Sequence, residues 1–189
     1  MKTRLTIATA LILALSACGS PEEADPADET AAPAEAAAQA PNPSTPQGFV
    51  AMAASSDMYE IEAGKLAQQM GTSEAVKEFG ATMQRDHTTS SDKLKAAVAE
   101  AGDGLAVPAA MLPKHQTQLD ALRNAGADFD TLYLQQQQAA HQEALNLLNS
   151  VSQAGTVAPL KAFATEASPV VQAHLEHVLE LAEAAGGGE

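Results

Sequence analysis

The sequence predicts an all-α fold, an antiparallel bundle of four long helices in up-down-up-down order. From Phe49 onward the chain is rich in Ala, Leu, Gln, Glu and Met, which are residues that favour helices. Apolar residues recur there at spacings of three and four, which is typical of helices that bury one face. Glycine and proline interrupt this pattern in only a few places, so most of the turns between helices are expected to be short.

The long helices are expected at residues 49–70, 73–101, 127–152 and 158–185. The first should end before Gly71, and Thr72 or Ser73 should cap the second, which Gly102 then stops. A short amphipathic helix at residues 114–124 is expected in the connection that follows. Pro169 lies inside the last helix and predicts a kink or a break that divides it in two.

Residues 1–17 have the pattern of a lipoprotein signal peptide. A short basic start precedes an apolar run of 11 residues from Leu5, which is too short to span a bilayer as a stable helix. The tetrapeptide ending at Cys18, Leu-Ser-Ala-Cys, resembles a bacterial lipobox, which implies cleavage before Cys18 and its acylation, for example with palmitate. The alternative is an ordinary secreted protein whose signal contains a cysteine. Lipid at Cys18 would anchor the protein to a membrane surface.

Residues 18–48 are expected to form a disordered tether, and residues 186–189 a disordered tail. Residues 19–48 contain six of the ten prolines, six acidic residues, and no basic, aromatic or large aliphatic residue. Such a segment cannot bury enough apolar surface to offset the entropy of ordering. The folded bundle is therefore assigned to residues 49–185. By analogy with lipoprotein sorting, Gly19 rather than Asp after the lipidated cysteine favours the outer membrane of the envelope, facing the periplasm.

Charge and cysteine content exclude two classes of function. The formal net charge of −14 and the absence of a basic patch argue against a nucleic-acid partner. A single cysteine cannot form an intramolecular disulfide or a multi-thiolate metal site. Any metal ion would therefore be held by histidine and carboxylate.

Candidate ligands lie on or beside the apolar faces of all four long helices, at positions that share one layer of the bundle. Three imidazoles and one carboxylate in such a layer suit a single Zn, Cu or Fe ion. The same groups could instead satisfy one another as a structural polar layer. The candidate ligands are Glu60, His87, His141 and His174, with Glu62 and Asp86 as residues that could orient them.

Other polar residues are not expected to take part. His115 lies next to Lys114 on the connecting segment and is expected to be exposed to solvent. His177 is placed on the edge of its helix's apolar stripe. The glutamines at residues 135–138 are expected on the helix surface.

The sequence resembles the domain-of-unknown-function family 4142 of bacterial envelope proteins. The matching segments are SDMYEIEAGKLA at 56–67, VKEF at 76–79, Met83, DHT at 86–88, GADFD at 126–130, Tyr133, His141, SP at 168–169 and HL at 174–175. The resemblance implies a ferritin-like helical fold in which Glu60, Asp86, His87, His141 and His174 recur. Ser168 departs from the Leu that more usually precedes the proline, which affects local packing more than ligation. No Glu stands three residues before any of these histidines, so a ferroxidase-type di-iron centre is not expected.

These observations predict an envelope lipoprotein with a buried metal site and no assigned activity. The alternative is a non-catalytic structural or interaction lipoprotein that docks onto another envelope component, its buried histidines serving only the core. The sequence shows no activated nucleophile and no cofactor fingerprint, so an enzymatic role has no support.

Overall fold

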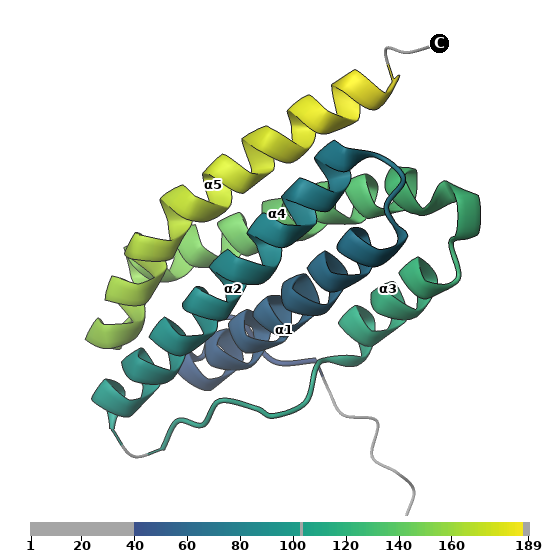
Figure 1. Cartoon of the computed structure of the whole chain (residues 1–189). Helices are drawn as coiled ribbons and strands as arrows, with labels where there is room; N and C mark the ends of the chain where they lie inside the picture. The colour runs from purple at the N-terminus through teal and green to yellow at the C-terminus, as the bar shows by residue number, and fades with distance from the viewer. Residues whose placement is uncertain (1–39, 103, 187–189) are drawn as a thin grey trace, which may run out of the picture. The chain divides into compact units, whose positions relative to one another are not determined.

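The computed structural model describes residues 40–102 and 104–186, and these residues are helical without a strand (Figure 1). The predicted all-α class is thereby confirmed. The elements are α1 Pro46–Met70, α2 Glu74–Ala101, α3 Pro113–Arg123, the 3-10 turn η1 Gly126–Asp128, α4 Phe129–Ala154 and α5 Ala158–Gly186. None of the helices in these residues is both long and apolar enough to cross a membrane.

Local capping chemistry explains where the helices begin and end. The side chain of Thr45 accepts a hydrogen bond from the Gly48 amide at 3.0 Å, and Pro46 fills the first turn, so α1 begins three residues before Phe49. Ser73 caps α2 in the same way. Gly102 adopts a φ of 87°, which other residues rarely adopt, and ends α2 where the sequence predicted.

The four long helices surround one core in the order α1, α2, α5, α4, and α3 packs against α1 and α4 (Figure 1). Asp130 at the start of α4 accepts hydrogen bonds from the amides of Thr72 and Ser73, which lie in the turn between α1 and α2. At the other end, residues 43–49 and the turn between α4 and α5 line one small pocket. The helix α4 therefore runs parallel to α2.

The predicted up-down-up-down order is wrong for this reason. The connection after α2 does not turn back directly into the next long helix. It runs along the end of the bundle and α3 then returns along the side (Figure 1), so that α4 starts at the same end as α2. Even so, each helix is antiparallel to both of its neighbours.

The predicted division of the last helix is also wrong, because α5 continues through Pro169. Proline has no N–H to donate to the carbonyl four residues earlier, which weakens one turn. The exposed side of the helix carries the proline, while residues on both sides of it, including Phe163 and Val171, are buried in the core. Packing before and after the proline holds the helix in one piece.

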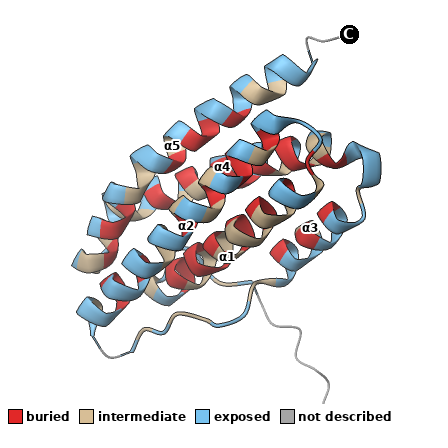
Figure 2. Cartoon of the chain, in the orientation of Figure 1, coloured by how far each residue is buried: buried red, intermediate tan, exposed pale blue. Residues whose placement is uncertain are grey.

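Buried residues lie along the inward faces of these helices (Figure 2). The largest ones are Tyr59, Tyr133, Phe49, Phe79, Phe129 and Met83. The backbones of α1 and α2 approach each other closely, because Gly64 and Gly80 face each other there. This close approach brings α1 within hydrogen-bonding distance of polar residues on α2, which are described next.

Candidate metal centre

Three histidines from three helices meet in the middle of the core. His87 of α2, His141 of α4 and His174 of α5 are all buried, and each offers a nitrogen within 4.8 Å of those of the other two. Their ring centroids are 5.4 to 5.8 Å apart. We call these residues the histidine triad.

One nitrogen of each triad histidine has no hydrogen-bond partner. These atoms are Nε2 of His87, Nε2 of His141 and Nδ1 of His174, and all three are shielded from solvent. Buried polar atoms in native proteins nearly always have a partner, so three unsatisfied nitrogens in one place call for an explanation.

The other nitrogen of each ring is held by the protein. Nδ1 of His87 lies 2.8 Å from Oδ1 of Asp57, and Nδ1 of His141 lies 2.8 Å from the backbone oxygen of Gln137. Nε2 of His174 lies 3.0 Å from Oδ2 of Asp86. An acceptor on one ring nitrogen keeps the proton there and leaves the lone pair on the other, which is the arrangement of metal-binding histidines.

The two carboxylates are themselves anchored. Asp57 on α1 is buried and also accepts a long hydrogen bond of 3.4 Å from Ser91. Asp86 is partly exposed and accepts a hydrogen bond from Nε of Arg85 at 2.8 Å. Burial raises the pKa of Asp86, but the hydrogen bonds from Arg85 and His174 outweigh it and hold that pKa below its usual value. Asp86 is therefore an anionic acceptor.

The triad histidines differ in their affinity for a proton. Burial lowers the pKa of His141 to about 3, helped by the neighbouring charge of His87. Burial also lowers the pKa of His174, despite the hydrogen bond to Asp86. Burial likewise disfavours the charged form of His87, but the hydrogen bond and charge of Asp57 outweigh it and raise that pKa. Among the three triad histidines, His87 is therefore the one whose surroundings favour a bound proton.

Glu60, the carboxylate expected as a fourth ligand, does not join the triad. It is 1% exposed, and one carboxylate oxygen accepts a hydrogen bond of 2.6 Å from Nε2 of Gln137. The other oxygen is 4.0 Å from Nδ1 of His141, on the side of the ring already bonded to the backbone. Burial, together with the charge of Asp57, raises the pKa of Glu60 to about 7 against the opposing effects of His87 and Gln137. The bond to Gln137 keeps Glu60 behind His141.

Two other residues lie elsewhere than the sequence predicted. Glu62 forms an ion pair of 2.6 Å with Lys65 at the surface of α1, and it contacts none of the triad histidines. Gln137 is fully buried instead of lying on the helix surface, because it shares the inward face of α4 with His141. Asp86, by contrast, contacts a triad histidine, though His174 rather than its neighbour His87.

Asp57, like Gln137, holds a residue of the site although the sequence pattern did not single it out. It lies three residues before Glu60 and four after Ala53, on the inward face of α1. A carboxylate at that spacing among small residues was the available signal, and its pairing with a histidine 30 positions away could not be read from the sequence.

His115 is buried, so its expected exposure to solvent is wrong. The helix α3 packs on α1, where Nδ1 of His115 lies 2.6 Å from Oγ of Ser55 and its ring stacks on Tyr59. Burial, together with the charge of Lys114, lowers the pKa of His115 to about 4. His177 is exposed and packs its edge against Phe79. Cys18 lies outside the residues that the structure describes.

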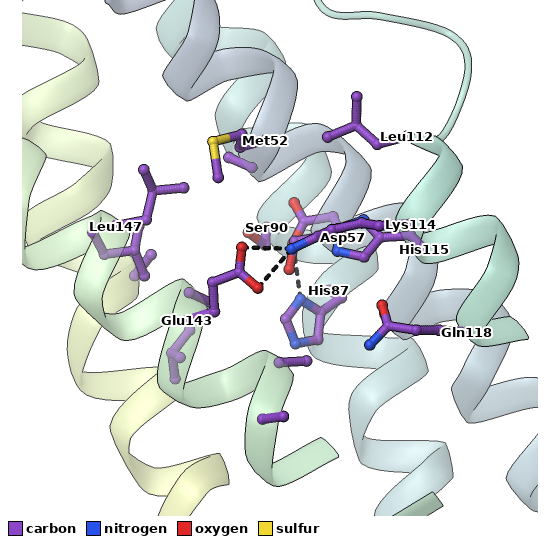
Figure 3. Close-up of a pocket in the computed structure, with 18 of the residues that line it drawn as sticks. Met52, Asp57, His87, Ser90, Leu112, Lys114, His115, Gln118, Glu143 and Leu147 are labelled. Carbon is purple, nitrogen blue, oxygen red and sulfur yellow. Dashed lines mark hydrogen bonds and ion pairs between the residues drawn. The ribbon is translucent and has the colours of Figure 1, made fainter. Parts of the chain in front are cut away.

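A pocket beneath α3 reaches the triad from one side (Figure 3). Figure 3 shows Asp57 bonded to His87 deep in this pocket, with the ion pair between Lys114 and Glu143 nearer to α3 and α4. A second pocket, between α2 and α5, is lined by both His87 and His174.

Comparison with known proteins gives one match. A family model described as Domain of unknown function (DUF4142) matches residues 30–181, which is most of the chain and includes every residue of the site. No curated protein and no solved structure matches the chain significantly.

Proposed function

Because the chain belongs to the DUF4142 family, whose description names no activity, we propose a function from its own residues: a mononuclear transition-metal centre formed by His87, His141 and His174. The three unsatisfied nitrogens carry this proposal. A metal ion would satisfy all three at once, while Asp57, Gln137 and Asp86 would orient the rings from behind.

The donor set indicates which metals fit. Three imidazole nitrogens without a thiolate suit Zn, Cu or Fe, whereas Ca and Mg prefer oxygen ligands. Two of the three histidines are already neutral in the metal-free protein, which favours binding. A metal ion on Nε2 of His87 would exclude a proton from that nitrogen, while Nδ1 would keep its hydrogen bond to Asp57.

The competing function is a structural or interaction protein whose buried histidines serve only the core. The pairs of His87 with Asp57 and of His174 with Asp86 support it, because each of these histidines is satisfied on one side without a metal. It does not explain why the remaining nitrogens of all three rings lie together without partners.

Metal titration separates these two functions. Protein purified without a chelator is analysed for metal content, and the metal-free protein is then titrated with Zn, Cu and Fe by calorimetry. We expect one metal ion per chain with a dissociation constant below micromolar, and a loss of at least about a hundredfold in His174→Ala. The exposed His177→Ala on the same helix serves as the matched control. Binding weaker than micromolar, or binding that His174→Ala leaves intact, would favour the structural function.

We further propose that the bundle is of the ferritin-like type. The single long crossover between α2 and α4 supports this, because ferritin-like bundles have one such connection and simple up-and-down bundles have none. An experimental structure in which α2 and α4 run antiparallel to each other would contradict it.

We also propose that the protein is a lipoprotein of the bacterial envelope, held on the periplasmic side, in the outer membrane, through lipid on Cys18. The basic start, the apolar run and the lipobox-like tetrapeptide support this. Metabolic labelling with a palmitate analogue should mark the wild-type protein and leave Cys18→Ala unlabelled. Fractionation of the envelope would then show which membrane carries it.

A further inference from the structure

We infer that the metal centre keeps one coordination position open toward the pocket between α2 and α5, and that a small anion from outside binds to the metal there. This inference rests on the proposed metal centre. It adds an exogenous ligand and the route by which that ligand enters.

The pocket between α2 and α5 has a volume of about 240 Å³ and is lined by His87, His174 and Asp86. The pocket beneath α3 is smaller, about 80 Å³, and His87 is the only triad histidine that lines it (Figure 3). On that side the carboxylate of Asp57 already occupies Nδ1 of His87. The larger pocket is therefore the route that reaches two ligands of the proposed metal.

Three protein ligands leave a tetrahedral metal ion with one free position, as in catalytic zinc sites. Glu60 is the buried carboxylate nearest to the triad apart from the two that hold its rings, and its bond to Gln137 keeps it behind His141. His141 does not line the pocket between α2 and α5, whereas the other two ligands do. The free position would therefore face that pocket.

The wall of the pocket between α2 and α5 is mixed in character. Phe163, Ala167, Val170 and Val171 provide apolar surface, and Ser90 provides a hydroxyl. Its charged residues are paired, Glu166 with Lys93 and Asp86 with Arg85 and His174. The volume corresponds to roughly eight water molecules at about 30 Å³ each, so the pocket has room for an anion of a few heavy atoms such as azide. Because the carboxylates of Glu166 and Asp86 already have cationic or hydrogen-bonding partners, the charge of the proposed metal ion would be the main attraction for an anion in this pocket.

Azide titration of the cobalt-loaded protein tests this inference. Cobalt binding is measured first by calorimetry, and azide binding is then followed by the visible absorption of the bound Co(II), which responds to its coordination. We expect saturable azide binding that Val170→Phe weakens at least tenfold. Val170 lines the pocket and is 45% exposed, so a larger side chain can narrow the entrance without disturbing the core.

Two matched variants show whether the route is the right one. Leu179→Phe enlarges a side chain of α5 that is 37% exposed and lines neither pocket, so azide binding should not change. Leu147→Phe narrows only the pocket beneath α3 and should also leave it unchanged. A loss of azide binding in Leu147→Phe but not in Val170→Phe would overturn the inferred route.

The outcomes distinguish this inference from the function on which it rests. If cobalt does not bind, both the metal centre and the open position are overturned. If cobalt binds and azide leaves its spectrum unchanged, the open position is overturned while the metal centre stands.

Discussion

Asp57 is the residue that most directly fixes the orientation of His87. It is buried on α1, while the histidine that it holds belongs to α2, so the contact depends on the close approach of these helices. Its carboxylate keeps a proton on Nδ1 of His87 and so leaves Nε2 facing the other two histidines.

We expect Asp57→Asn to weaken zinc binding by about 10- to 100-fold, because a neutral amide orients the ring less firmly and makes its nitrogen a weaker donor. Calorimetry at neutral pH measures the change. Glu62→Gln removes a carboxylate of the same helix that pairs only with Lys65 at the surface, and should leave the affinity unchanged. Equal losses in the two variants would show that charge, and not orientation, controls the affinity.

His115 links stability to pH at a distance from the triad. Its pKa in the folded protein is about 4, below the usual 6.5, so the unfolded chain binds a proton more readily than the folded one. The stability that neutral His115 provides is present above pH 6.5 and is lost as the pH falls from there toward about 4. The expected slope is at most about 1.4 kcal/mol per pH unit.

The variant His115→Asn isolates this effect, because an amide can still bond to Ser55 but does not titrate. Lys114 and Glu143, the charged groups that influence His115, remain in both proteins. Urea unfolding at several pH values gives the free energy of unfolding of each. The wild-type protein should lose stability faster than the variant as the pH falls below 6.5, and parallel curves would contradict the lowered pKa.

The helical pattern identifies the triad histidines for a simple physical reason. A period of 3.6 residues places each of His87, His141 and His174 on a face of its own helix, and an apolar face is buried in any bundle. The same reasoning fails for His115, because its burial depends on where α3 docks. It also fails for the pairing of Asp57 with His87, which depends on contacts between helices.

At the scale of the elements, the three histidines of the predicted layer lie together although the predicted helix order is wrong. The predicted up-down-up-down order places the turns at Gly71 and Gly155 at the same end of the bundle, whereas they lie at opposite ends. The histidines still meet because each lies near the middle of its helix, where depth is nearly the same from either end. If the histidines lay near the ends of their helices, the error in helix direction would have put them in the wrong layers.

The close approach of α1 and α2 at Gly64 and Gly80 predicts that Gly80→Ala destabilises the fold. A Cβ at residue 80 would lie 2.6 Å from Cβ of Ala67 and 2.8 Å from the backbone oxygen of Gly64, so the two helices would have to move apart. Overpacking of this kind costs about 1 to 3 kcal/mol, and the better helix propensity of alanine returns about 1 kcal/mol.

We therefore expect the free energy of unfolding of Gly80→Ala to fall by about 1 to 2 kcal/mol in urea. Ala81→Ser adds one heavy atom to the exposed neighbouring position of α2 and should stay within about 0.5 kcal/mol of the wild-type value. An unchanged or increased stability in Gly80→Ala would mean that α1 and α2 can separate without loss.

For the whole molecule, the crossover between α2 and α4 decides which helices surround the triad. Because residues 102–128 span the length of the bundle, α4 lies beside both α1 and α5, and α5 lies beside α2. The three ligand helices thus enclose the triad, and α1 contributes Asp57 and Glu60 from the remaining side. The sequence predicted the lengths of these helices but not the path of the crossover. The residues of the crossover do not show at which end of the bundle the next long helix begins.

The start of α1 sets how far the N-terminal segment can be shortened without loss of stability. A chain that begins at residue 40 should unfold at the same temperature as one that begins at Gly19, whereas a chain that begins at Phe49 should be less stable. The shorter chain loses the Thr45 cap and the two hydrogen bonds between Gln47 and the backbone of Ala106, together about 2 to 3 kcal/mol. Thermal and urea unfolding of the three chains measure the difference, and Gln47→Ala in the chain from residue 40 gives the share of the two hydrogen bonds. If the chain from residue 40 is itself destabilised, residues 19–39 contribute to the fold and the predicted tether does not exist as proposed.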